Sequence, residues 1–390
     1  MAIMIVVALS CVAGELPDNQ SDQSNITVSL ITCYPGPEIY ELCGHSAVRV
    51  QGEDLDMVWN YGIFDFNQPN FVYRFVKGET DYKGASYPFQ WFLPEYVASG
   101  RTVVEQDINF TPEEAQRMYE LLSISVLPEN ATYRYNYVKD NCSTRIINLL
   151  DSAAGVPIIY PDSVRYGTFR NEMRAYHEGY PWYQFGIDLA LGSGLDQKID
   201  SREEMFVPIE MMKNASGAHF SDGRPLIKST RVLNQGYHDA TLPATPWWFS
   251  PVLWGWIVAL LIGCVVVYNL LNHRLWPAVY AVWFFILGLA GCLIAFLVFV
   301  SVHEASSPNL LIFWLNPLQF LFVISIYIRK LKPLALAMAW YNIVAVGILL
   351  ILSPILPQSF NPAFFPLMLS TVGLASAYAI INNKLSYKKR

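Results

Sequence analysis

The chain has 390 residues, of which 53% are hydrophobic and only 15% are charged, and its formal net charge is −6 at pH 7. Soluble chains usually carry about 25% charged residues, and here almost all the acidic residues precede Gly236, whereas apolar runs dominate the later part. This excludes a wholly soluble protein and predicts a soluble part followed by a membrane part, while the acidic balance and the lack of a basic stripe argue against a nucleic-acid partner.

The first residues, "MAIMIVVALSCVAGE", have an apolar core followed by small residues. We interpret residues 1–14 as a secretory signal-like segment, although the usual basic start is missing. A short anchor and a poor lipobox cysteine at Cys11 are the alternatives. Residues 15–25 are polar and predict a linker, because they cannot bury a core.

Five stretches of the soluble part are predicted to be β-strands, because two of them alternate between apolar and polar residues and a third is rich in aromatic and β-forming residues. The predicted strands span residues 26–35, 46–50, 57–66, 102–110 and 131–138. A helix is predicted after the fourth strand, because Thr111 is a good cap, Pro112 fits the first turn and two glutamates follow. A second helix is predicted over 142–154, ending at Gly155.

Residues 156–235 are mixed and rich in Tyr, Gly and Pro, and we expect loops and short helices there. The soluble part is therefore predicted to be an α+β domain, with a small antiparallel sheet and helices packed against it. We expect this domain to cover 26–245 and a helical membrane domain to cover 246–390.

Five apolar stretches are long enough to cross about 30 Å of hydrocarbon. The predicted spans are Trp248–Leu271, Ala278–Val302, Leu310–Ile328, Leu334–Leu352 and Ala363–Ile381. The sequence "PWWFSPVLWGW" at the first span is typical of an aromatic belt at a bilayer surface.

The charge of the connecting loops predicts the orientation of these spans. Residues 272–277, 329–333 and 383–390 carry Lys or Arg, whereas 301–309 and 357–366 carry none. The positive-inside rule places the first three in the cytoplasm and therefore places the soluble domain outside. The loop that contains His303 and Glu304 would then face that domain. His303 is a candidate substrate-binding residue, and a solvated loop residue is the alternative.

Cys142 begins the second predicted helix, where Asp140 or Asn141 would be the N-cap. Free N–H groups and the helix dipole at this end stabilise an anion, and a nearby base can lower a thiol pKa from about 8.5 to between about 3.5 and 7.5. Backbone N–H groups of the same turn could also bind an oxyanion. The alternative is a small buried residue, which is what most free cysteines are.

Such a thiolate needs a histidine as its base, and His45 is the best candidate. It stands in "CGHSAVRV" at the head of a strand, after a glycine that permits close approach. His177 and His219 lie in polar stretches and are expected at the surface, and His238 is close to the membrane boundary.

Six segments of the chain resemble the Lnb family of membrane-anchored lipoprotein N-acyltransferases. They are "LCGHSAVRV", "WNYGIFDF", "NFVYRFVKGETDY", "YRYNYVKDNCSTRIINLL", "WYQFGIDLALG" and "HEASSPNLLIFWLNPL". More distantly, the order of His first and Cys later is similar to permuted NlpC/P60 and lecithin:retinol acyltransferase-like enzymes. The resemblance implies a papain-like α+β fold of permuted NlpC/P60 type, followed by a helical membrane domain of about five transmembrane helices.

The same resemblance implies that Cys142 is the nucleophile and His45 the base. A polar residue on the next strand would orient the imidazole, and Asn60 is the first candidate and Asp65 the second. The alternative for Asn60 is a plain strand residue. Arg145, one turn after Cys142, is a candidate for holding a phosphate head group, or else a solvated helix residue.

The implied reaction moves an acyl chain from a membrane phospholipid, through a thioester on cysteine, to the α-amine of a diacylated lipoprotein. The implied location is a bacterial inner membrane, with the catalytic domain periplasmic and the C-terminus cytoplasmic. The alternatives are a cysteine peptidase or amidase, a phospholipase or thioesterase, and a non-enzymatic membrane sensor.

The remaining cysteines are expected to have structural roles, and no metal site is expected. Cys33 and Cys43 flank a turn and would form either a disulfide or two buried thiols. Cys264 and Cys292 lie inside predicted spans, where we expect them to pack. The sequence has no ligand spacing such as HExxH or CxxC, so we expect no metal and no cofactor.

Overall fold

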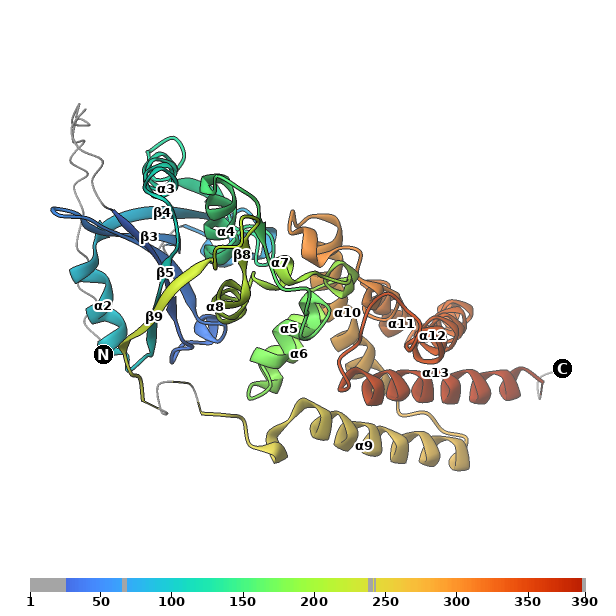
Figure 1. The fold of residues 1–390 in the computed structure, drawn as a ribbon. Coiled ribbons are helices and arrows are strands. Elements are labelled where there is room, and N and C mark those ends of the chain that lie inside the picture. Colours follow the sequence, from blue (N-terminus) through green and yellow to red (C-terminus); the bar gives the residue numbers. More distant parts are fainter. Residues whose placement is uncertain (1–25, 65–68, 238–240, 242, 388–390) are drawn as a thin grey trace.

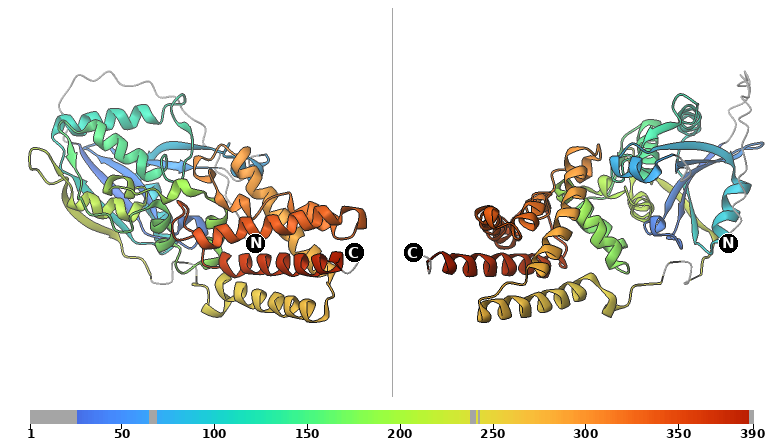
Figure 2. Two further views of the ribbon diagram at one scale, coloured as in Figure 1. Left: turned by 90° about the vertical axis from the view of Figure 1, so that its right-hand side faces the viewer. Right: turned by 180° about the vertical axis from the view of Figure 1, so that it is seen from behind.

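A computed structural model of the chain describes residues 26–64, 69–237, 241 and 243–387. The signal-like segment and the linker expected over 1–25 lie outside the described residues, as does Asp65. Two parts of the molecule lie side by side (Figures 1 and 2): a sheet domain, which begins at β1, and a helical domain, which begins at α9.

The sheet domain is built on seven antiparallel strands. Their spatial order is β6 (Thr132–Arg134), β4 (Asp81–Pro88), β3 (Asp56–Ile63), β2 (His45–Gln51), β1 (Thr27–Cys33), β5 (Val103–Ile108) and β9 (Ile227–Asn234). The five predicted strands are confirmed, although the fifth is shorter than expected. The prediction of only loops and helices over 156–235 is wrong for β9, an edge strand whose middle residues are exposed.

Helices cover both faces of this sheet. One face carries α3 (Pro112–Ser125), α4 (Cys142–Ala153) and α8 (Pro208–Gly217), and the other carries α2 (Phe89–Ala98). The core of the first face includes Val48 and Val50 of β2 and Ile146, Ile147 and Leu150 of α4, all of them buried. Each such side chain stabilises the fold by about 1.5–3 kcal/mol relative to exposure, so α4 is held firmly on the sheet.

The predicted helix starts are confirmed. Thr111 caps α3, and its hydroxyl accepts a hydrogen bond from the N–H of Glu114, whose carboxylate in turn accepts from the N–H of Thr111. After α4 the chain forms the short helices α5 (Phe169–Tyr176), α6 (Pro181–Ala190) and α7 (Ser201–Glu204) and a two-stranded ladder of β7 (Ile158–Ile159) and β8 (His219–Phe220).

In the described part of the helical domain, four helices are long and apolar enough to cross a membrane. They are α9 (Pro251–Asn272), α10 (Pro277–Phe299), α12 (Lys332–Leu352) and α13 (Phe364–Tyr387). In Figure 1, α9 and α13 run side by side, and they are in contact. Cys264 and Cys292 lie on α9 and α10, where both are exposed at the helix surface rather than packed as expected.

The predicted span Leu310–Ile328 is not one continuous helix. It forms a 3-10 turn over Leu310–Phe313 and then α11 (Gln319–Ser325). The break coincides with Asn316–Pro317, because proline lacks an N–H and disfavours the helical conformation of the preceding residue. The amides of Asn316 and Gln319 donate to the carbonyls of Ile312 and Trp314, so neighbouring protein groups satisfy the freed backbone.

The broken segment still crosses from one side to the other. Ser301 and His303, just after α10, contact the sheet domain, and so does Ser359, after α12. The start of α12 lies about 30 Å from its end, at 1.5 Å per residue. Since α10 and α12 both end beside the sheet domain, the chain between them must return through the same depth, which gives five crossings.

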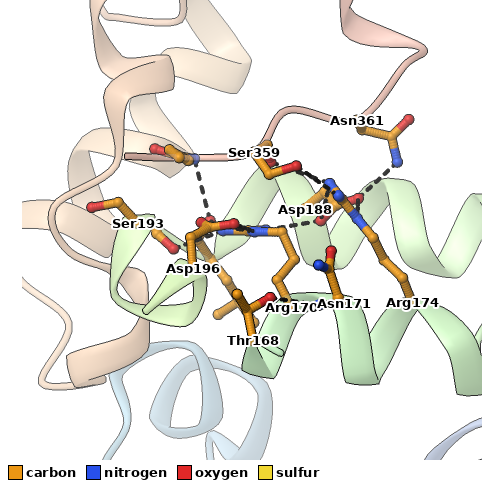
Figure 3. A network of polar contacts seen from close by, with 12 residues as sticks. Thr168, Arg170, Asn171, Arg174, Asp188, Ser193, Asp196, Ser359 and Asn361 are labelled. Carbon is orange, nitrogen blue, oxygen red and sulfur yellow. Dashed lines mark hydrogen bonds and ion pairs between the residues drawn. The ribbon is translucent and has the colours of Figure 1, made fainter. Parts of the chain in front are cut away.

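A polar network joins the two domains (Figure 3). Arg170 and Arg174 of α5 pair with Asp188 of α6, whose carboxylate also accepts a hydrogen bond of 2.9 Å from Asn361. The guanidinium of Arg174 donates to the hydroxyl and carbonyl of Ser359. These contacts attach the sheet domain to the end of the helical domain that carries the loop after α12.

Candidate active site

The start of α4 is fixed by the side chain of Asn141. Its Oδ1 accepts hydrogen bonds of 2.9 Å from the N–H groups of Ser143 and Thr144, and its amide donates to the carbonyls of Tyr137 and Phe206. Asn141 rather than Asp140 is therefore the N-cap, and Cys142 is the first residue of the helix. A capped and buried helix start holds the thiol in one place.

His45 is the first residue of β2, opposite Cys33 of β1. The preceding Gly44 has φ +80°, and a Cβ there would lie 2.5 Å from the carbonyl oxygen of Cys33. Only glycine fits this turn without strain. The turn brings the chain into β2 so that the imidazole stands at the end of the sheet.

The structure brings His45, Cys142 and Asn60 together. The imidazole of His45 lies beside the thiol of Cys142, close enough for its charge and a hydrogen-bonding contribution to stabilise the thiolate, and its Nε2 lies 2.5 Å from Oδ1 of Asn60. Because Nε2 is engaged with Asn60, Nδ1 is the ring nitrogen left for the thiol. The amide of Asn60 also donates to the hydroxyl of Tyr87 over 2.8 Å, and this second bond holds the Asn60 side chain beside the imidazole.

The electrostatics of the pair favour a thiolate beside an imidazolium. Burial opposes the charged thiolate, but the charge and hydrogen bond of His45, the N–H of Ser46 and the hydroxyl of Ser143 outweigh it and lower the pKa of Cys142. Burial likewise opposes the imidazolium, but Cys142 and Asn60 stabilise it and raise the pKa of His45. Shifts in opposite directions of this kind are typical of an activated cysteine nucleophile.

Sequence reasoning missed two serines in this site. Ser46 contributes its backbone N–H to the sulfur of Cys142, and Ser143 contributes its hydroxyl. The two hydroxyls also lie 3.1 Å apart and are buried. The sequence offered one indication of their role: Ser46 directly follows His45, and Ser143 directly follows Cys142.

The N–H of Cys142 is a candidate oxyanion donor. It belongs to the first turn, whose N–H groups have no partner inside the helix, and the cap satisfies those of Ser143 and Thr144 instead. Within the part of the chain that the structure describes, no hydrogen bond is found for the N–H of Cys142. An acyl oxygen held at the sulfur would lie within reach of this group.

Arg145 and His303 have other partners at present. Arg145 donates two hydrogen bonds to Asp140, of 2.6 and 2.9 Å, and its guanidinium lies 3.4 Å from the ring centroid of Tyr133. Nε2 of His303 lies 2.8 Å from the carbonyl oxygen of Phe75. The loop of His303 and Glu304 faces the sheet domain as predicted, and Glu304 forms a 3.0 Å ion pair with Lys139. Lys139, one partner of this ion pair, precedes Cys142 by three residues in the chain.

One expectation about the other side chains is corrected, and one open alternative is decided. His177 is buried rather than at the surface, and Nδ1 lies 2.8 Å from Oε1 of Gln184; burial lowers its pKa. His219 is exposed as expected, and His238 lies outside the described residues. Cys33 and Cys43 are free thiols and not a disulfide. They pack in different clusters, Cys33 under α2 and Cys43 beside the hydroxyl of Tyr137, so their side chains point to separate parts of the core.

The site is closed in this structure. Cys142 is only 8% exposed. Two surface cavities, of about 260 and 550 Å³, are lined by other residues and reach neither Cys142 nor His45. Among the described residues, no group of three or more His, Cys, Asp and Glu side chains is arranged to hold a metal ion.

Comparison with protein-family models gives two matches. Residues 14–171 match the Lnb N-terminal periplasmic domain, and residues 243–387 match the Lnb transmembrane domain. Searches of curated proteins and of solved structures gave no match. The two matched regions include the candidate site and the four described helices that are long and apolar enough to cross a membrane. This is a membrane protein with a periplasmic domain, and the chain belongs to the Lnb-type lipoprotein N-acyltransferase family.

Proposed function

We propose that the protein transfers an acyl chain from a membrane phospholipid to the α-amine of a diacylglyceryl-cysteine lipoprotein, through a thioester on Cys142. One arrangement carries the proposal: a thiol at a capped helix start lies beside the imidazole of His45, and Lys139, three positions earlier, pairs with a loop of the membrane domain. The nucleophile therefore lies near the bilayer surface, where both substrates reside. The family supports an acyltransferase role of this kind.

In the first half-reaction, the thiolate of Cys142 attacks the ester carbonyl of the phospholipid. A C–S bond forms, and the charge that develops on the carbonyl oxygen is stabilised by the N–H of Cys142. The C–O bond to glycerol then breaks, and the imidazolium of His45 gives its proton to the leaving oxygen. The products of this step are a lysophospholipid and the thioester enzyme.

In the second half-reaction, the α-amine of the lipoprotein attacks the thioester. A C–N bond forms while the C–S bond breaks, and neutral His45 takes the proton that the amine loses. The thiolate of Cys142 and the imidazolium are thereby restored. Two transfers through one covalent enzyme form require ping-pong kinetics, and Asn60 keeps the imidazole oriented in both.

The topology fits this chemistry. The helices α9 and α13 begin, and α10 and α12 end, beside the sheet domain. An odd number of crossings then places the end of α13 on the opposite side of the membrane, and in Figure 1 α13 runs away from the sheet domain. With the sheet domain in the periplasm, we propose that the C-terminus is cytoplasmic, as the positive loops predict.

The test is a two-stage mass measurement on the purified full-length protein in phospholipid vesicles. We expect an acyl adduct on the peptide that contains Cys142, absent in Cys142→Ala and strongly reduced in His45→Ala. Addition of a diacylated lipopeptide should discharge the adduct onto its amine. Discharge to water alone would leave a phospholipase or thioesterase, and no adduct with any acyl donor would overturn the proposal.

A further inference from the structure

A row of aromatic rings runs from the neighbourhood of Cys142 to helix α1 (Phe71–Lys77). Tyr135 stacks on Tyr82 with ring centroids 4.2 Å apart, and Tyr82 contacts Phe64 at 5.0 Å. Phe64 stacks on Phe71 at 6.2 Å, and Phe71 on Phe75 at 5.9 Å. These separations are those of interacting aromatic pairs. We refer to the five rings as the aromatic row.

The inner end of the row lies at the candidate nucleophile. A Cβ built on Gly62 would lie 3.9 Å from both Cβ of Cys142 and Cε2 of Tyr135, so these two side chains flank the same residue of β3. Tyr82 is only 7% exposed. The row therefore begins inside the closed site, and any apolar group that reaches the thiol along it must pass Tyr135.

The outer end of the row lies against the membrane domain. Helix α1 is attached to the segment after α10 by three hydrogen bonds: Val302 to Lys77, Ser301 to Val76, and His303 to Phe75. The ring of Tyr73 also contacts Phe296 of α10, with centroids 6.0 Å apart. Helix α1 is thus held at the level where α10 ends.

The exposed side of α1 is apolar. Val72 is 74% exposed, Tyr73 54% and Phe75 48%, and the exposed apolar residues Phe299 and Val302 continue this surface onto the end of α10. An exposed apolar surface that continues a transmembrane helix contacts lipid rather than water. Within the row, Tyr82 is buried, Tyr135, Phe64 and Phe71 are half-buried, and Phe75 at the outer end is exposed.

We propose that α1 contacts the bilayer and that the aromatic row is the track along which the acyl chain of the phospholipid donor reaches Cys142. This inference rests on the proposed function for the identity of the donor. The proposal is supported by continuity: among the described residues, the aromatic row links the lipid-facing surface of α10 to the thiol of Cys142 through apolar side chains. Cys142 and Tyr82 are buried, so the chain enters by displacing the rings of the row.

The first experiment measures binding without chemistry. The Cys142→Ala variant is placed in vesicles that contain a phospholipid with a diazirine at the end of one acyl chain. The sample is illuminated, and the labelled residues are identified by mass spectrometry. We expect labelled residues on α1 and in the aromatic row. Labelling confined to α9–α13 would overturn the proposed track, whether or not the protein proves to be an acyltransferase.

The second experiment compares two acyl donors with the reactive protein. In Phe75→Asp, acylation of Cys142 by long-chain phospholipid in vesicles should fall at least about tenfold, the loss expected when a few buried methylene contacts are removed. Acylation by a monomeric dibutyryl phospholipid should stay within about twofold of the unchanged protein, since a short chain needs no track. Val72→Asp, at a more exposed position, repeats the test if Phe75→Asp does not fold.

The matched control is Val232→Asp, which places the same charge at an exposed apolar position on β9, at the other edge of the sheet. It should change neither rate. Equal losses with both donors in Phe75→Asp, or no loss with either, would overturn the track. Failure of the unchanged protein to react with either donor would instead count against the proposed function, and the labelling experiment would then decide the track alone.

Discussion

Nε2 of His45 lies 2.5 Å from Oδ1 of Asn60, and the strand pairing makes this contact possible. Asn60 of β3 is opposite Ala47 of β2, two residues after His45, so the two side chains stand on the same face of the sheet. The amide donates to Tyr87 on the next strand. Since the amide oxygen accepts from Nε2–H, the imidazole presents Nδ1 to Cys142.

Asn60→Ala should therefore reduce the rate of acylation of Cys142 by about 100-fold, because misplacing a reacting group by about 1 Å has effects of this size. Tyr87→Phe keeps Asn60 but removes the bond that orients its amide, so we expect a smaller loss. Single-turnover acylation measures both. Asn60→Asp retains an acceptor and should restore most of the rate, with the pH optimum shifted upwards. An unchanged rate in Asn60→Ala would contradict the assigned orientation.

Local sequence signals predicted the parts of this site that depend on chain neighbours. The cap at Asn141 and the glycine before His45 follow from the short-range preferences of helices and turns. Asn60 was found because it lies on the strand after the histidine, as the family resemblance implied. The meeting of Cys142 with His45 and Asn60 depends on how the sheet brings together residues up to 97 positions apart in the chain. The family resemblance implied this meeting, and residue patterns alone do not reveal it.

The features that sequence patterns missed depend on long-range contacts. Strand β4 contains Gly84 and ends at Pro88, and β9 is a polar edge strand, so neither shows clear alternation. His177 lies in a polar stretch yet is buried, because Gln184 on the next helix satisfies one ring nitrogen. The break at Asn316 is also supported by Tyr341, on another helix, whose hydroxyl accepts a hydrogen bond from the Asn316 amide.

The reactivity of Cys142 should depend on pH in a way that requires His45. Because the imidazolium lowers the pKa of Cys142, alkylation by a small neutral reagent should show an inflection below the usual thiol pKa. In His45→Ala burial remains without the compensating charge, so the inflection should move above the usual value. Ser143→Ala should give a smaller shift in the same direction.

The measurement is the rate of alkylation of the peptide that contains Cys142, followed by mass spectrometry from pH 5 to 10. Peptide-level detection is needed because Cys33, Cys43, Cys264 and Cys292 are also free thiols. Cys43 is an internal control, since burial raises its pKa to about 11. Coincident inflections of Cys142 in the unchanged protein and in His45→Ala would show that the pair is not coupled.

Asp188 should be important for the attachment of the two domains. Its side chain is fully buried and receives Arg170, Arg174 and Asn361 (Figure 3). Removing one partner of a buried ion pair leaves an unpaired charge, so Asp188→Ala should lower the free energy of unfolding by about 3 kcal/mol. Asn361→Ala removes one hydrogen bond to a charge and should cost about 1.5–3 kcal/mol.

Thermal unfolding of the purified protein in lipid nanodiscs measures these losses. The control is Asp151→Ala, which removes the half-exposed ion pair with Arg202. Exposed pairs contribute about 0–1 kcal/mol, so this variant should unfold close to the unchanged protein. If Asp188→Ala were no worse than Asp151→Ala, the network would not hold the domains together.

Glu172 of α5 is buried without a hydrogen-bond donor among the described residues. Burial and the charges of Glu204 and Glu210 raise its pKa to about 8, with Arg165 acting in the opposite direction. At neutral pH the carboxyl is therefore largely protonated in the folded protein. In the unfolded chain its pKa returns to about 4.3.

The sign of the pH effect follows from these two pKa values. Between about 4.3 and 8 the folded state binds a proton that the unfolded state lacks, so stability falls as the pH rises, by at most about 1.4 kcal/mol per pH unit. Glu172→Gln removes this titration. The thermal midpoint of the variant, relative to that of the unchanged protein, should therefore rise between pH 5 and pH 8. Glu129→Gln, at an exposed position, should give a curve parallel to the unchanged protein. If the Glu172→Gln curve were also parallel, Glu172 would not hold a proton in the folded state.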